Sequence, residues 1–176
     1  MQGVREALKG EHVRRGTLLA AIGLCALLGI AGCSLLGDQG PDFTFWEPEL
    51  SPDGTTLAYE SQAGDSLELY LRDLATNVER RLTENEVDDW SPSWSPDGDR
   101  IAFASSRDKN ADVYVIALDS LEEHRLTTNE SDDINPSWGV DGRIYFNSNR
   151  TDTWEIYVVD PDGSNLTKLT GEIAEE

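Results

Sequence analysis

Alternating apolar and polar positions recur along the chain in short segments that are separated by glycine, proline and aspartate. The segments read TLAYES, RIAFASS and RIYFNSN at one place in the pattern, and LELYLRDL, DVYVIAL and WEIYVVD at the next. Alternation with a period of two is typical of a β-strand with one buried face. After residue 33, no ten-residue stretch keeps a helical period free of turn residues. The pattern therefore predicts an all-β fold.

The same pattern returns three times. Asp53, Asp97 and Asp141 are spaced by 44 residues, and the third unit has lost one residue in a turn, where DGDRI becomes DGRI. Each unit contains four segments with strand character, and the units span about residues 45–85, 86–129 and 130–170. Four-stranded repeats of about 40 to 45 residues are typical of propeller blades. The sequence thus predicts three four-stranded blades, which make a partial β-propeller.

Turn chemistry supports this division. SPDG stands at residues 51–54 and 95–98, and GVDG stands at residues 139–142. Proline fixes φ at the second turn position and glycine accepts the closing conformation at the fourth, so each segment predicts a hairpin. DPDGSN at residues 160–165 also resembles the start of an EF-hand calcium loop, but residue 171 is glycine where that loop needs a bidentate glutamate. A hairpin turn is the better interpretation.

The second unit, PSWSPDGDRIAFASSRDKNADVYVIALDSLEEHRLT, resembles the TolB-type, WD-like propeller repeat, with its P-x-W-S-P-D-G turn and closing L-T. The resemblance covers about residues 45–170, although Leu50 replaces the tryptophan of the first unit and Val140 replaces the proline of the third. Rings of this family close at six or more blades, so the resemblance implies half of the smallest ring. Three blades leave exposed faces and edges. We expect a homodimer, with pairing to a second propeller chain or a poorly folded gene remnant as alternatives.

The first 32 residues have the features of an export signal. Four basic residues precede the uncharged stretch TLLAAIGLCALLGIAG, which is shorter than the about 20 residues of a membrane-spanning helix. IAGC at residues 30–33 resembles the bacterial lipobox, which implies a signal peptide over 1–32 and a lipidated, palmitate-bearing Cys33. Residues 33–44 then form the lipidated cysteine and tether, and 171–176 form a tail. Ser34 favours, by the family pattern, the outer membrane facing the periplasm; an uncleaved anchor helix is the alternative.

Charge and composition exclude several classes of function. The chain carries 34 acidic and 14 basic residues, a formal net charge of −20. Such a surface repels nucleic-acid phosphates, and it suits cations, basic protein patches or neutral ligands, or serves only solubility. The sequence has no G-x-S-x-G motif and no transition-metal spacing of His and Cys. The one histidine after the signal, His124, falls on a predicted fourth strand. We therefore predict a non-enzymatic protein without a cofactor.

The richest candidate site is an acidic loop before the first strand of the second and third units. The loops read NEVDDW at residues 85–90 and NESDDI at residues 129–134. The candidate contact residues are Glu86, Asp88, Asp89, Glu130, Asp132 and Asp133. In the propellers that the chain resembles, this connection opens at the mouth of the central channel, where partners bind. The carboxylates would meet basic side chains, sugar hydroxyls or calcium; alternatively, they bond backbone groups in turns.

Tryptophans at three repeat positions are a weaker candidate. Trp90, Trp94 and Trp138 would be able to stack on sugars, but their place beside prolines inside the repeat favours packing between blades. The resemblance implies a non-enzymatic cell-envelope lipoprotein that serves as a protein-interaction scaffold, as the family does in the Tol-Pal system. Two alternatives stay open. One is an accessory propeller module that acts in trans with a peptidase, and the other is a glycan-binding surface lipoprotein.

Overall fold

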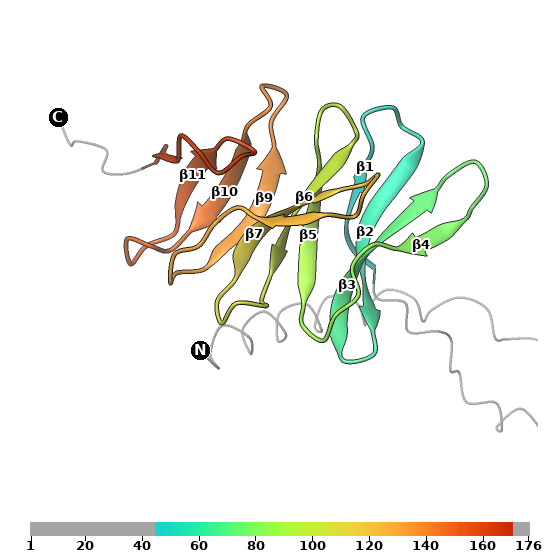
Figure 1. Ribbon diagram of the computed structural model, residues 1–176, viewed down its shortest axis with the longest axis horizontal. Helices are drawn as coiled ribbons and strands as arrows, with labels where there is room; N and C mark the ends of the chain where they lie inside the picture. The colour runs from blue at the N-terminus through green and yellow to red at the C-terminus, as the bar shows by residue number, and fades with distance from the viewer. Residues whose placement is uncertain (1–44, 171–176) are drawn as a thin grey trace, which may run out of the picture. The chain divides into compact units, whose positions relative to one another are not determined.

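The computed structural model describes residues 45–170. The segments 1–32, 33–44 and 171–176 lie outside the described residues, so the lipidation of Cys33 stays a prediction. The described part forms three four-stranded antiparallel sheets, each built from strands that are consecutive in the sequence (Figure 1). The prediction of an all-β fold with three four-stranded blades is confirmed. The sheets are called blades 1, 2 and 3 in chain order.

The strands have similar bounds in every blade. Blade 1 contains β1 (Phe45–Leu50), β2 (Thr56–Ala63), β3 (Ser66–Asp73) and β4 (Glu79–Arg81). Blade 2 contains β5 (Asp89–Trp94), β6 (Arg100–Ser105), β7 (Asp112–Ala117) and β8 (Glu123–Arg125). Blade 3 contains β9 (Asp133–Trp138), β10 (Ile144–Ser148), β11 (Glu155–Val159) and β12 (Thr167–Lys168). The fourth strand is the shortest in each blade, which limits pairing of that edge with other chains.

The turn between the first and second strands has the predicted chemistry. Gly54, Gly98 and Gly142 have φ angles of 74°, 76° and 82°, a conformation that residues with a side chain rarely adopt. The amide of Gly54 donates a hydrogen bond of 2.8 Å to the carbonyl of Ser51. Residues 160–165 likewise close the hairpin between β11 and β12. Both hairpin predictions are confirmed.

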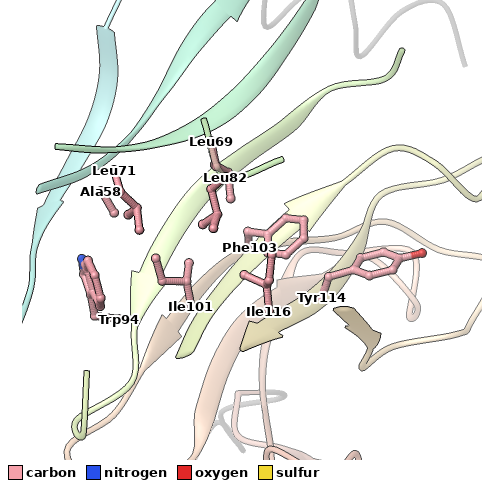
Figure 2. Packing of buried hydrophobic residues seen from close by; sticks show 9 residues of the cluster. All are labelled: Ala58, Leu69, Leu71, Leu82, Trp94, Ile101, Phe103, Tyr114 and Ile116. Carbon is pink, nitrogen blue, oxygen red and sulfur yellow. The ribbon is translucent and has the colours of Figure 1, made fainter. Parts of the chain in front are cut away.

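The hydrophobic core lies between successive blades. Figure 2 shows the first cluster, which contains Ala58, Leu69, Leu71 and Leu82 of blade 1 with Trp94, Ile101, Phe103, Tyr114 and Ile116 of blade 2. A second cluster repeats this arrangement between blades 2 and 3, with Trp138 at the place of Trp94. Trp94 and Trp138 are 6% and 8% exposed. Both tryptophans are core residues, as the sequence favoured.

The first strands of successive blades contact one another, and each contains a bulge. The bulge residues Glu47, Ser91 and Asn135 have φ angles of 44°, 52° and 53°. The Ser91 hydroxyl donates to Glu47 at 2.6 Å and lies 3.4 Å from the side-chain oxygen of Asn135. Because a bulge redirects the side chain that it carries, the three bulges align one polar residue per blade across the first strands.

Candidate functional site: the acidic loops and the buried carboxylates

The predicted contact residues lie in the two loops that lead into β5 and β9 and at the first residue of each strand, Asp89 and Asp133. From the most to the least buried, the pairs at equivalent positions are Asp89 and Asp133, Asp88 and Asp132, and Glu86 and Glu130. The first pair is fully buried, the second is half-buried and the third is exposed. The two loops therefore share one design, and the three acids in each loop have different surroundings.

The buried aspartates form ion pairs inside the protein. Nη2 of Arg107 lies 3.1 and 3.0 Å from the two carboxylate oxygens of Asp89, and the Asn85 amide donates to Asp89 at 2.7 Å. Arg150 binds both oxygens of Asp133 at 3.0 Å in the same way. A buried charge needs a partner of this kind to offset its loss of hydration. These ion pairs fasten each loop to the end of the second strand of its own blade.

The half-buried aspartates fasten each loop to the preceding blade. Asp88 accepts a hydrogen bond of 3.0 Å from the backbone amide of Leu67, at the beginning of β3. Asp132 accepts one of 3.0 Å from the amide of Ala111, next to β7. These bonds are of the side-chain-to-backbone type that the sequence left open as the alternative. They connect adjacent blades rather than a turn with itself.

Glu86 and Glu130 are the two candidates with exposed side chains. They stand between the asparagine that begins each loop and the two aspartates that hold it. Their carboxylates are accessible to a partner, and their role as contacts stays a prediction. His124 is also exposed, on β8, which is the fourth strand of its blade as the sequence indicated.

A second set of carboxylates, at the beginning of the third strands, is not among the residues that the sequence singled out. The pairs are Arg81–Glu68 at 3.0 Å, Arg125–Asp112 at 2.7 Å and Lys168–Glu155 at 3.2 Å. In each blade, the threonine of the closing L-T sequence donates its hydroxyl to the same carboxylate. The signal is present in the sequence as an acid 13 residues before a basic residue in every repeat.

Two further acids lie in blade 1 where it meets blade 2. Glu60 accepts a hydrogen bond of 2.7 Å from the amide of Ser91, and Glu49 accepts one of 2.8 Å from the amide of Trp94. Burial raises the pKa of Glu60 to about 7 and the pKa of Glu49 above its usual range, although these hydrogen bonds oppose the change. Part of the protein's negative charge at this junction therefore titrates near neutral pH.

Ion pairs and hydrogen bonds are the contacts that the structure shows for the described carboxylates. Within residues 45–170, no three or more His, Cys, Asp or Glu side chains are grouped so that they hold a metal ion. The calcium alternative for the acidic loops stays a prediction. In that same part of the chain, we find no helix of the length and hydropathy that crossing a membrane requires. Exposed carboxylates of this kind suit the recognition of basic groups.

Comparison with known proteins identifies relatives of this arrangement. None of the curated proteins matches the chain. A TolB protein from Agrobacterium tumefaciens is 32% identical, with a TM-score of 0.67 over 72% of this chain and 46% of that one. TolB from Acinetobacter baumannii is 25% identical, with a TM-score of 0.65 over 74% of this chain and 33% of that one. A puromycin-hydrolyzing peptidase from Mycobacterium tuberculosis, 17% identical over 71% of this chain and 22% of that one (TM-score 0.60), shares the fold.

The chain spans less than half the length of either TolB structure. The family model of the TolB beta propeller domain matches residues 42–175, which include every blade that the structure describes. The predicted resemblance is thereby confirmed, and the chain belongs to the TolB β-propeller family.

Proposed function

We propose that this chain is a non-enzymatic cell-envelope protein that serves as a protein-interaction scaffold, and that its three blades form a ring with a second copy. The observation that carries the proposal is the open face of blade 3. Ile156 and Leu169 on this face are 41% and 51% exposed. Val113 and Leu126, at the same repeat positions in blade 2, are 0% and 8% exposed because blade 3 covers them.

Leaving this face in water has a cost. Fully burying one leucine or isoleucine side chain stabilises a protein by about 1.5–3 kcal/mol. Large apolar patches on a soluble protein are therefore typical of interaction surfaces. Blade 3 packs against the equivalent face of blade 2, so we expect another blade to pack against the exposed face of blade 3 in the same way.

Blade 1 of a second copy offers a suitable cover. Leu50 is 50% exposed at the repeat position where Trp94 and Trp138 are buried between blades. Within the chain, the equivalent face of blade 2, with Trp94, packs on blade 1, and that of blade 3, with Trp138, packs on blade 2. Head-to-tail contacts form a closed ring when the rotation permits. Two copies supply six blades, the smallest ring of the family pattern.

Ser137 supports the same contact. At the junction of blades 2 and 3, the Ser93 hydroxyl accepts a hydrogen bond of 2.9 Å from the amide of Trp138. Ser137 has the position of Ser93 one blade later, and it is exposed. In the proposed ring, the amide of Leu50 from the other copy takes the place of the Trp138 amide and donates to Ser137.

Native mass spectrometry of the full chain, released from detergent, tests the ring. We expect the mass of two chains. Leu169→Asp is expected to give single chains, because a carboxylate is costly to bury in this contact. Leu121→Asp is the matched control, since Leu121 is 50% exposed in the turn after β7 and its substitution leaves the dimer intact. A wild-type chain that stays single at micromolar concentration, or a Leu169→Asp chain that still pairs, contradicts the ring.

The proposed envelope location rests on the N-terminal segment. A lipid on Cys33 would hold the scaffold at the outer membrane. Radiolabelled palmitate, supplied to cells that produce the chain, is expected to label the wild-type chain and not Cys33→Ala. Equal labelling of both chains would place the lipid on another residue and contradict the assignment.

An accessory propeller module for a peptidase is the second candidate function. It is favoured by the fold that this chain shares with the peptidase from Mycobacterium tuberculosis. For either function, we propose that Glu86 and Glu130 supply charged contacts to the partner. Cross-linking in cells followed by mass spectrometry separates the two functions, because a cross-linked peptidase supports the second. The same experiment tests the two glutamates: loss of the cross-linked partner in a Glu86→Gln/Glu130→Gln chain supports their role as contacts.

A further inference from the structure

A cleft of about 710 Å³ lies between blades 1 and 2, beside the turns that join their first and second strands. Leu71, Trp94 and Leu118 form part of its lining, together with Pro52 and Pro96 from the two turns. Volumes of this size are typical of sites that bury most of a small ligand. The cleft is large enough for a long side chain and part of the backbone that carries it.

Carboxylates surround this apolar lining. The acidic residues that line the cleft are Asp53, Asp73, Asp97 and Asp99, and Arg80 is the basic residue among them. Hydrogen bonds from Ser51 and Ser95 lower the pKa of Asp53 and Asp97. The rim is therefore negatively charged at neutral pH, and it attracts cations while it repels phosphate and carboxylate groups.

At the equivalent place in the next junction, the chain supplies an arginine side chain of its own. Between blades 2 and 3, the guanidinium carbon of Arg100 lies 4.9 Å from the ring centre of Trp138, and Nη2 of Arg100 lies 3.4 Å from Asp97. The equivalents in the first junction are Trp94 for Trp138 and Thr56 for Arg100, 44 residues earlier in each case. Thr56 has no cationic group and is several atoms shorter. Both Thr56 and Trp94 line the cleft.

We propose that the cleft between blades 1 and 2 binds an arginine side chain from an extended segment of a protein partner. The aliphatic part of that arginine packs on the apolar lining, as the stem of a long cationic side chain commonly does. Its guanidinium pairs with the carboxylates of the rim, and Asp53 takes the role that Asp97 has for Arg100. This inference deepens the proposed scaffold function, but it does not depend on ring closure.

A capped Gly-Gly-Arg-Gly-Gly peptide tests the site, with its citrulline twin as a neutral probe of the same shape. Calorimetric titration of the full chain in detergent at physiological salt is expected to show one site, with binding of the arginine peptide at least about tenfold tighter than that of the twin. Equal affinity for the two peptides, or no heat from either, overturns the proposal.

Thr56→Arg is the decisive variant, because it gives the first junction the side chain that the second already has. We expect it to weaken peptide binding by at least about tenfold, with the thermal unfolding midpoint unchanged. Asp73→Asn is a milder variant that keeps a side-chain acceptor for Thr76, and it is expected to weaken binding about threefold through the lost charge. Asp65→Asn, an exposed acid at the other end of β2, is the control and should bind as the wild type does. If both cleft variants bind the peptide as tightly as the wild type, the proposal is wrong.

The reciprocal substitution, Arg100→Thr, is expected to open an equivalent cleft at the second junction. The number of arginine-peptide sites should rise from one to two. A single site in Arg100→Thr would show that the two junctions are not equivalent and would overturn the argument from repetition. Leu169→Asp separates this inference from the proposed ring, because a chain that no longer pairs should still bind one peptide. If wild-type chains form dimers but do not bind the arginine peptide, the inference about the cleft is wrong and the proposed ring is unaffected.

Discussion

Asp112 in blade 2 and Glu155 in blade 3 occupy the same repeat position, but their acidities change in opposite directions. Burial raises the pKa of Asp112 to about 6, even though Arg125 and Thr127 favour its charged form. Hydrogen bonds from Thr170 and Lys168 lower the pKa of Glu155. Each carboxylate has a basic partner and a threonine hydroxyl, so the bonded groups do not explain the difference.

The difference lies in the neighbouring blade that covers one carboxylate and not the other. Asp112 is fully buried, and Asp133, from the loop that enters blade 3, adds a like charge that raises its pKa further. The side chain of Glu155 is 17% exposed, in the last blade that the structure describes. A repeat position therefore acquires its electrostatic character from the next blade as much as from its own. Blade 3, the last blade that the structure describes, shows this repeat position without a covering blade.

Removing the cation from each pair should give the largest effect. Arg125→Ala leaves Asp112 buried without its ion-pair partner, and it is expected to lower the free energy of unfolding by about 4 kcal/mol. Lys168→Ala removes the equivalent cation from the more accessible Glu155, and it should cost less than about 1 kcal/mol. Urea unfolding of the two variants measures both values. Equal losses would show that the covering blade does not set the strength of the pair.

Truncating one leucine in each of the two blades tests the same comparison for apolar packing. Leu126 and Leu169 share a repeat position but are 8% and 51% exposed. Leu126→Ala opens a cavity between blades 2 and 3 and should lower the free energy of unfolding by about 3 kcal/mol. Leu169→Ala should change it by less than about 1 kcal/mol in single chains, and should instead weaken the proposed dimer. A large loss in single chains of Leu169→Ala would contradict an open face.

The two junctions also differ in a buried acid, because Glu60 in blade 1 has Ala104 as its counterpart in blade 2. The pKa of Glu60 is about 7 in the folded protein, against an ordinary value of 4.5. Between these values the folded protein holds a proton that the unfolded chain releases, so this group's contribution to stability is present at low pH and is lost as the pH rises towards 7. The stability of Glu60→Gln relative to the wild type is therefore expected to rise by about 3 kcal/mol between pH 4.5 and pH 7.5.

Urea unfolding at the two pH values measures that gain. Gln keeps an oxygen that accepts from the amide of Ser91, so the hydrogen bond is retained while the charge is removed. Glu122→Gln, the same change at an exposed site, should show no pH-dependent gain. An equal pH dependence in the wild type and Glu60→Gln would mean that folding does not raise the pKa of Glu60.

Features that depend on neighbouring residues in the chain could be predicted from the sequence. The strands, the turns at Gly54 and Gly98 and the buried Trp94 follow from periodicity and turn chemistry, which act over a few residues. Pairs such as Arg107 with Asp89 could not be predicted, because they depend on strand register across 18 residues. For the same reason, the sequence did not distinguish the buried Asp89 from the exposed Glu86 in the same loop.

The burial of Glu60 is even harder to predict from the sequence. Its hydrogen-bond partner, Ser91, is 31 residues away in the next blade. Its burial results from the packing of two blades, and a repeat with alanine at the equivalent position gives no hint of it. The ion pairs of Glu68, Asp112 and Glu155 occur in all three repeats, and the sequence marks each of them as an acid 13 residues before a basic residue.

The smallest effect concerns the turn in which blade 3 departs from the family pattern. Val140 is 100% exposed at the place of Pro52 and Pro96. The closing bond from Gly142 to Gly139 is 2.9 Å, as in the second turn, so proline should fit. Val140→Pro is expected to raise the free energy of unfolding by about 0.5 kcal/mol through reduced freedom of the unfolded chain, as measured by the urea midpoint.

Pro96→Val is the reverse control and should lose a similar amount. The comparison separates proline from the rest of the turn, because blade 3 also has glycine in place of the serine that begins the other two turns. A Cβ atom at Gly139 would lie 2.5 Å from Asp141 and 2.8 Å from the ring of Tyr145. Gly139→Ser should therefore destabilise the chain where Val140→Pro stabilises it. If both substitutions stabilise it, the contacts of Asp141 and Tyr145 do not require glycine at position 139.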